Sequence, residues 1–137
     1  HERLVGSEMC IRDRTYTKDH LEAFFELDTY FYSSFYTNNL LPAAINFTKN
    51  YRRWYGKEMD ERYPKFGMLG FDTGYFFLKG LARYGSSFEK NMQGLDLIPI
   101  QTGFKFQRVN NWGGFINKKV FFVHFTKNFE LVKLDFD

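Results

Sequence analysis

The chain has 137 residues, is 44% hydrophobic and 21% aromatic, and carries a formal net charge of +3 at pH 7. This length suits one domain or part of one, and the aromatic content can fill a core. No apolar run approaches the roughly 20 residues that a membrane-spanning helix needs, so we expect no membrane span. Basic residues lie among acidic ones, as in residues 57–62 (KEMDER), so we expect no nucleic-acid partner.

The first fourteen residues look foreign to the rest of the chain. Residues 4–13 (LVGSEMCIRD) show no hydrophobic period, and as codons they can be written CTC GTG GGC TCG GAG ATG TGT ATA AGA GAC. This string resembles a transposase adapter of shotgun sequencing libraries. We therefore expect residues 1–14 to be an adapter-derived artefact without ordered structure. The domain is then expected to span residues 15–137, as the C-terminal portion of a longer metagenomic gene product.

The only cysteine, Cys10, lies within this opening segment. If the segment is an artefact, the natural chain offers no disulfide, no cysteine-ligated metal site and no cysteine nucleophile. Neither a Ser–His–Asp order nor a paired-carboxylate motif is visible in the remaining residues. His20 and His124 have no second ligand at metal-binding spacing. The sequence therefore predicts no enzyme activity, no metal and no cofactor.

The first half of the chain shows a short helix, a strand and a longer helix. Residues 18–27 (KDHLEAFFEL) have the spacing of a short amphipathic helix. Residues 29–36 (TYFYSSFY) alternate as a strand does, with tyrosines and a serine on one face and Phe31, Ser33 and Phe35 on the other. Residues 42–57 predict a helix, since Pro42 suits a first turn and one stripe holds Ala44, Phe47, Tyr51, Trp54 and Tyr55.

A second long helix is predicted over residues 68–84 and is expected to end at Gly85. Its apolar residues cover most of the circumference, which predicts packing on more than one side. Gly74 is interpreted as a place where another backbone comes close.

From Ile98 the period changes to two, and strands are predicted around residues 99–109, 118–125 and 129–136. Helices followed by a terminal run of strands indicate an α/β arrangement.

The order of these elements resembles the final third of the type I periplasmic-binding-protein fold, the branched-chain amino-acid receptor-like superfamily. Phe47 and Tyr51 match a Phe-x-x-x-Tyr helix, and Pro64 matches the proline that follows it. Residues 70–85 (GFDTGYFFLKGLARYG) match the next helix, with Phe71 in place of Tyr and Thr73 in place of Ala. Residues 118–134 (KKVFFVHFTKNFELVKL) are similar to the closing strands. The aromatic-rich segments 66–77 and 108–122 are closer to an exported cell-envelope branch often associated with LysM peptidoglycan-binding repeats.

The resemblance covers about residues 30–134 and implies part of a two-lobed α/β protein whose lobes close on a ligand. In such proteins the strand matching residues 29–36 crosses between the lobes. The implied function is that of a non-enzymatic, solute-binding domain in the periplasm or cell envelope, which binds a small polar molecule such as an amino acid. The alternative is an envelope interaction or regulatory protein with the same fold, which acts on peptidoglycan or its synthetic machinery without a free solute. Tyr and Ser facing a void would favour the first, and Phe filling that space would favour the second.

Four residues of the crossing strand are candidate ligand contacts: Tyr32, Ser33, Ser34 and Tyr36. The simpler interpretation is a strand packed under helices with its tyrosine hydroxyls at the surface.

Asp72 is expected in the first turn of its helix, where it would cap free amides, with contact to a ligand ammonium as the other possibility. With Gly74 it is a candidate structural or hinge residue. Trp112, in residues 110–114 (NNWGG), is either a recognition surface or a staple between two strands.

Overall fold

The computed structural model describes residues 10–11, 21–60 and 64–134, and the side chains from residue 21 onward. The chain divides into two compact units. Unit 1 comprises His1–Ser34 and Val120–Asp137, and unit 2 comprises Phe35–Lys119. The predicted mixture of helix and sheet is confirmed at this coarse level, and most strand pairs are antiparallel.

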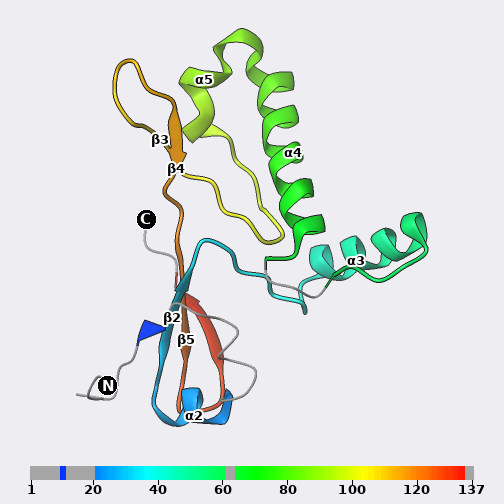
Figure 1. Ribbon diagram of the computed structural model, residues 1–137, viewed down its shortest axis with the longest axis vertical. Helices are drawn as coiled ribbons and strands as arrows, with labels where there is room; N and C mark the ends of the chain where they lie inside the picture. The colour runs from blue at the N-terminus through cyan, green and yellow to red at the C-terminus, as the bar shows by residue number, and fades with distance from the viewer. Residues whose placement is uncertain (1–9, 12–20, 61–63, 135–137) are drawn as a thin grey trace. The chain divides into compact units, whose positions relative to one another are not determined.

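In its described residues, unit 1 contains a four-stranded sheet and the short helix α2 (Figure 1). The strand order is β1 (Cys10–Ile11), β2 (Tyr30–Ser33), β5 (Phe121–Phe125) and β6 (Leu131–Leu134). β1 pairs with β2 in parallel, whereas β2–β5 and β5–β6 are antiparallel. The expectation that residues 1–14 lack structure is therefore wrong for Cys10 and Ile11, because their backbones align with Tyr30 and Phe31 of β2. The other residues of that segment lie outside the described residues.

The core of unit 1 follows the period-two pattern of its strands. In β5, Phe121, Val123 and Phe125 are buried, while Phe122 and His124 are half-buried on the opposite face. The helix α2 (Leu21–Glu26) covers the buried face: its Phe24 is buried, with ring centroids 5.8 Å from Phe125. The predicted helix and the predicted alternation in this region are confirmed.

Thr29 is a buried residue whose hydroxyl has no hydrogen-bond partner among the described residues. Its backbone is satisfied, since its N–H donates to the carbonyl of Phe24 and its carbonyl accepts from the N–H of Phe125. Thr29→Val keeps the shape and removes the unpaired hydroxyl, so we expect the free energy of unfolding to rise by about 1 kcal/mol. Urea unfolding measures this. Thr126→Val is the control, because its hydroxyl accepts from the N–H of Glu130 at 3.2 Å; a loss at Thr29 as large as the control's would contradict the prediction.

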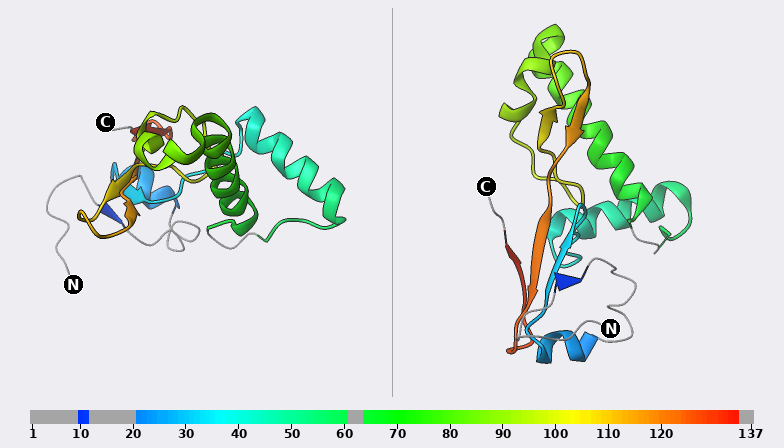
Figure 2. Two further views of the ribbon diagram at one scale, coloured as in Figure 1. Left: turned by 90° about the horizontal axis from the view of Figure 1, so that it is seen from above. Right: turned by 60° about the vertical axis from the view of Figure 1, so that its left-hand side comes forward.

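Outside residues 61–63, unit 2 contains two long helices, a short helical segment and a hairpin. The helices are α3 (Pro42–Tyr55) and α4 (Phe66–Tyr84), followed by η1 (Gly85–Ser87), α5 (Phe88–Asn91) and η2 (Met92–Gly94). The hairpin pairs β3 (Phe106–Arg108) with β4 (Phe115–Asn117). Figure 2 shows α3 and α4 running in clearly different directions.

Both long helices confirm their predictions to within two residues. Pro42 opens α3, and α4 ends at Tyr84 with Gly85 at a φ of 53° as its C-cap.

The strand predictions after Ile98 are less accurate. Of the predicted strand 99–109 only β3 forms, and β4 lies between the predicted strands 99–109 and 118–125. The backbone of residues 100–102 bonds to a side chain of α4 instead of extending β3, as described below.

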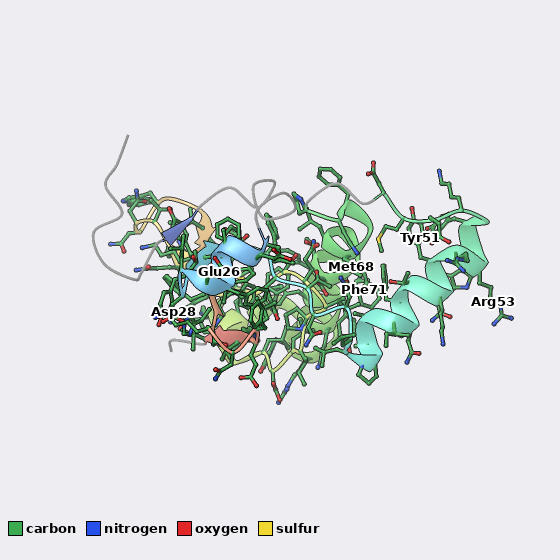
Figure 3. The ribbon with its side chains drawn as sticks, turned by 90° about the horizontal axis from the view of Figure 1, so that it is seen from below. Glu26, Asp28, Tyr51, Arg53, Met68 and Phe71 are labelled. Carbon is green, nitrogen blue, oxygen red and sulfur yellow. The ribbon has the colours of Figure 1, made fainter. Side chains whose placement is uncertain are left out.

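The buried side of α4 carries Met68, Asp72, Phe76 and Gly80, one residue per turn. Met68 packs with Ala44 of α3 and with Met59, while Phe76 packs with Phe88 and Leu95. Figure 3 shows Met68 and Phe71 on α4, Tyr51 on α3, and Arg53 projecting away from α4. The predicted stripe of α3 is buried at Ala44 and half-buried at Phe47 and Tyr51, but Trp54 and Tyr55 at its end are exposed.

The predicted packing of α4 on more than one side is found in part. Phe71 contacts Phe47 of α3, and Phe77 contacts Phe88 and Phe106, whereas Tyr75, Leu78 and Leu81 are between 46% and 71% exposed. The prediction for Gly74 is wrong, since no described atom outside its own helix backbone lies within 4 Å of where its Cβ would stand. Close approaches within α4 are found at Gly67, beside Met59, and at Gly80, where an added Cβ would overlap the ring of Phe88. In the described part of the chain, no helix combines the length and the apolar character needed to cross a membrane.

Candidate functional site

The four predicted ligand contacts are divided between the two units. Tyr32 and Ser33 belong to β2 and Ser34 follows it in unit 1, whereas Tyr36 belongs to unit 2. The predicted alternation over residues 29–36 holds only to Ser33, where β2 ends. Tyr32 and Ser34 are exposed, Ser33 is half-buried opposite Phe121, and half-buried Tyr36 donates its N–H to the carbonyl of Gln101 at 2.9 Å.

Among the described residues, Tyr32 is one of four ring side chains on the side of the unit 1 sheet opposite Phe121, Val123 and Phe125. We call this the aromatic face and define it as Tyr30, Tyr32, Phe122 and His124. The register of β2 and β5 places Tyr30 opposite His124 and Tyr32 opposite Phe122, so all four side chains project from the same face. The Tyr30 and His124 rings are stacked at 4.2 Å and 6°, and the Tyr32 and Phe122 centroids are 6.2 Å apart.

A charged group lies at the edge of the aromatic face. The carboxylate Oδ1 of Asp28 is 2.7 Å from Nε2 of His124, and both side chains are largely shielded from solvent. Asp28 has a φ of 55°, a left-handed conformation that Asp tolerates better than most residues. It lies just beyond the end of α2, close to Glu26 (Figure 3). The carboxylate therefore fixes the orientation of the imidazole ring against Tyr30.

This arrangement suits a small amphipathic molecule. The exposed ring of Tyr32 and the neighbouring Phe122 offer apolar surface, and a cation can also bind over such a ring. The phenol of Tyr32 and the Asp28–His124 pair offer polar contacts at this face, and the hydroxyl of Ser34 offers one just beyond the end of β2. Binding sites commonly combine a mostly apolar lining with a few placed polar groups.

Sequence reasoning missed four members of this site: Tyr30, Phe122, His124 and Asp28. The sequence offers no second ligand for His124 at metal-binding spacing, and in the structure His124 is paired with Asp28, 96 residues away along the chain. The alternation of residues 118–125 already placed Phe122 and His124 on one face. The missing information was the register with β2, which no local pattern contains.

Asp72 occupies a different position from the one predicted. It is the seventh residue of α4, not in the first turn, and it is 1% exposed. It accepts hydrogen bonds from the backbone of a loop: Oδ1 accepts from the N–H of Ile100, and Oδ2 accepts from the N–H groups of Gln101 and Thr102, each at 2.8 Å. The prediction that it caps the amides of its own helix is wrong, and its bonds are those of a structural residue.

Gln101 completes this buried junction. Its side-chain Oε1 accepts from the N–H of Lys65 at 3.0 Å, and its Nε2 donates to the carbonyl of Lys65 at 3.2 Å. Lys65 is the residue before α4, so Gln101 satisfies the backbone where the helix begins. The junction joins residues 36–37, the start of α4 and the loop 100–102, and it explains why these loop residues do not continue β3.

Trp112 lies at the tip of the β3–β4 hairpin and is 99% exposed. The interpretation of Trp112 as a staple between two strands is therefore wrong, whereas its interpretation as a recognition residue stays a prediction. Gly74, the other predicted hinge residue, lies in the middle of α4.

Among the residues with described placement, no group of three His, Cys, Asp or Glu side chains is arranged to hold a metal ion. Comparison with protein-family models, with curated proteins and with solved structures finds no match for the chain.

Proposed function

We propose that the chain is part of a non-enzymatic, extracytoplasmic ligand-binding domain of the type I periplasmic-binding-protein kind, which binds a small polar molecule such as an amino acid. The observation that supports this proposal is the aromatic face, where exposed Tyr32 lies beside Phe122 and on the same face as the Asp28–His124 pair. The resemblance of residues 30–134 to that fold gives the location, the periplasm or cell envelope. The proposal needs no cofactor.

An amino acid matches the groups on this face. Its ammonium is complementary to the carboxylate of Asp28 and to the face of the Tyr32 ring. Its carboxylate can accept hydrogen bonds from the hydroxyls of Tyr32 and Ser34, and an aliphatic or aromatic side chain can pack on Phe122. The ligand would then be held by both its charges and its apolar part.

Tyr32→Ala tests this proposal. The twenty common L-amino acids are titrated individually into the whole chain by calorimetry, and at least one is expected to bind. Tyr32→Ala should weaken that binding about tenfold or more, because it removes both the ring and the hydroxyl. Tyr55→Ala is the matched control, since Tyr55 is a 63% exposed tyrosine on α3. If no amino acid binds, or if both variants bind as the unmodified chain does, the proposal fails.

The second candidate is an envelope interaction or regulatory protein with the same fold, acting on peptidoglycan or its synthetic machinery without a free solute. The exposed apolar side chains of α4 favour it, because Phe71, Tyr75 and Leu78 are 44%, 46% and 71% exposed, with the ammonium of Lys79 over the Tyr75 ring. In this case no amino acid binds, and Leu78→Glu weakens capture of an envelope protein while Tyr32→Ala leaves it unchanged.

A further inference from the structure

The β3–β4 hairpin of unit 2 carries a cationic and apolar surface that the proposed function does not use. The outward side chains of the two strands are those of Lys105, Gln107, Val109, Ile116 and Lys118, and all five are exposed. They share one face because Gln107 pairs with Ile116, and the N–H of Lys118 donates to the carbonyl of Lys105 one step further along. We call these five residues, together with Trp112 at the tip, the hairpin surface.

The hairpin surface is ordered from apolar to cationic along its length. Trp112 at the tip is 99% exposed, and Val109 and Ile116 next to it are 58% and 46% exposed. Lys105 and Lys118 lie on the same face. Lys105 is four residues before Val109, and Lys118 is two residues after Ile116. At about 3.3 Å per residue, Lys105 is roughly 13 Å from Val109 along the chain.

The tip is held in place by its own hydrogen bonds. The side-chain Oδ1 of Asn110 accepts from the N–H of Trp112 at 2.9 Å, and the N–H of Val109 donates to the carbonyl of Gly114 at 3.0 Å. Arg108 donates to the carbonyl of Asn111 and forms an ion pair with Glu89 of α5. The other face of the hairpin is fixed to the core by Phe106, whose ring is 5.3 Å from that of Phe76. Little ordering of the tip is therefore needed when a partner binds.

The charge of the hairpin selects an anionic partner. Residues 97–129 contain no Asp or Glu, and the hairpin region supplies Lys105, Arg108, Lys118 and Lys119. Arg108 is balanced by Glu89, so the lysines carry the net charge. A soluble anion or a phosphate alone would make no use of the exposed Val109, Trp112 and Ile116.

We propose that the hairpin surface docks on an anionic lipid bilayer. Trp112, with Val109 and Ile116, enters the interfacial layer, where an indole places its ring in an apolar environment and its N–H near water. Lys105 and Lys118 then lie at the level of the lipid phosphates, where each lysine contributes to binding. The contact is peripheral and independent of the aromatic face in unit 1.

Trp112 reports on this contact by fluorescence. In the full chain carrying Trp54→Phe, Trp112 is the remaining tryptophan. Phosphatidylcholine vesicles that contain phosphatidylglycerol should shift its emission to shorter wavelength, and added salt should reverse the shift. Vesicles of phosphatidylcholine alone should give little shift. In Trp112→Phe, where Trp54 reports, no shift is expected.

Co-sedimentation with the same vesicles separates the apolar and cationic contributions. Trp112→Ala should weaken binding about tenfold, and Lys105→Gln with Lys118→Gln should weaken it about fivefold per lysine. Lys49→Gln with Lys57→Gln makes the same change in net charge away from the hairpin and should have a smaller effect. Circular dichroism checks that each variant is folded.

Three results would overturn the proposal: no emission shift, equal binding to neutral vesicles, or equal losses for the two lysine pairs. Binding of single-stranded DNA or of insoluble peptidoglycan that needs Trp112, without vesicle binding, would assign the surface to another macromolecule and would also reject it.

Discussion

Asp72→Ala is expected to lower the free energy of unfolding of unit 2 by about 4 kcal/mol, which is a large effect for one substitution. The carboxylate of Asp72 accepts hydrogen bonds from three backbone N–H groups of residues 100–102 in a nearly solvent-free environment. Alanine leaves these donors without an acceptor, and each buried unsatisfied group costs about 1–3 kcal/mol. The three losses are not additive, because the loop can relax once it is released.

Urea unfolding of Asp72→Ala, Asp72→Asn and Asp96→Ala tests this expectation. Asparagine keeps one acceptor oxygen but places an N–H₂ group where the other oxygen stood, so its loss should be smaller than that of alanine and still larger than about 1 kcal/mol. Asp96 is exposed, and the hydrogen bond found at this residue is made by its backbone carbonyl. If Asp72→Ala unfolds at the same urea concentration as Asp96→Ala, the junction does not stabilise the unit as described.

Gly80→Ala and Gly74→Ala are expected to change stability in opposite directions although both lie within α4. At Gly80 the added methyl group would overlap the ring of buried Phe88, which packs against Phe76 at 5.8 Å and cannot easily move. Overpacking of this kind costs about 1–3 kcal/mol and exceeds the gain in helix propensity. At Gly74 the space is open, so alanine should stabilise the helix by up to about 1 kcal/mol.

Thermal unfolding followed by circular dichroism at 222 nm, the wavelength of helix signal, separates the two glycine variants. We expect a lower midpoint for Gly80→Ala and a higher one for Gly74→Ala. A stabilised Gly80→Ala would show that Phe88 is loosely packed. A destabilised Gly74→Ala would show that another part of the protein, or a partner, approaches this position.

The proposals for the two units can be tested separately. The aromatic face is formed by β2 and β5 of unit 1, and the hairpin surface belongs to β3, β4 and the loop between them in unit 2. Tyr32→Ala changes the first and Trp112→Ala the second. Loss of amino-acid binding with unchanged vesicle binding, or the reverse, assigns each activity to its own surface.

The sequence determined the elements whose signal is local. The helices α3 and α4 could be predicted because apolar residues recur with a period of 3.6, Pro42 favours a first turn and Gly85 accepts a positive φ. The period of two over residues 118–125 predicted the strand β5, whose side chains alternate between a buried and a half-buried face because successive residues of a strand face opposite sides. These features depend only on neighbours within a few positions along the chain.

The tertiary structure decided which distant residues meet. Asp72 contacts a loop about 28 residues further on, and Asp28 contacts His124 across 96 residues. Gly80, not Gly74, is a close approach because Phe88 returns to that side of α4. The turn that brings back the chain, and the register that aligns β2 with β5, are set by the packing of whole elements. A local pattern determines the face on which a side chain lies, whereas the fold determines what lies opposite that face.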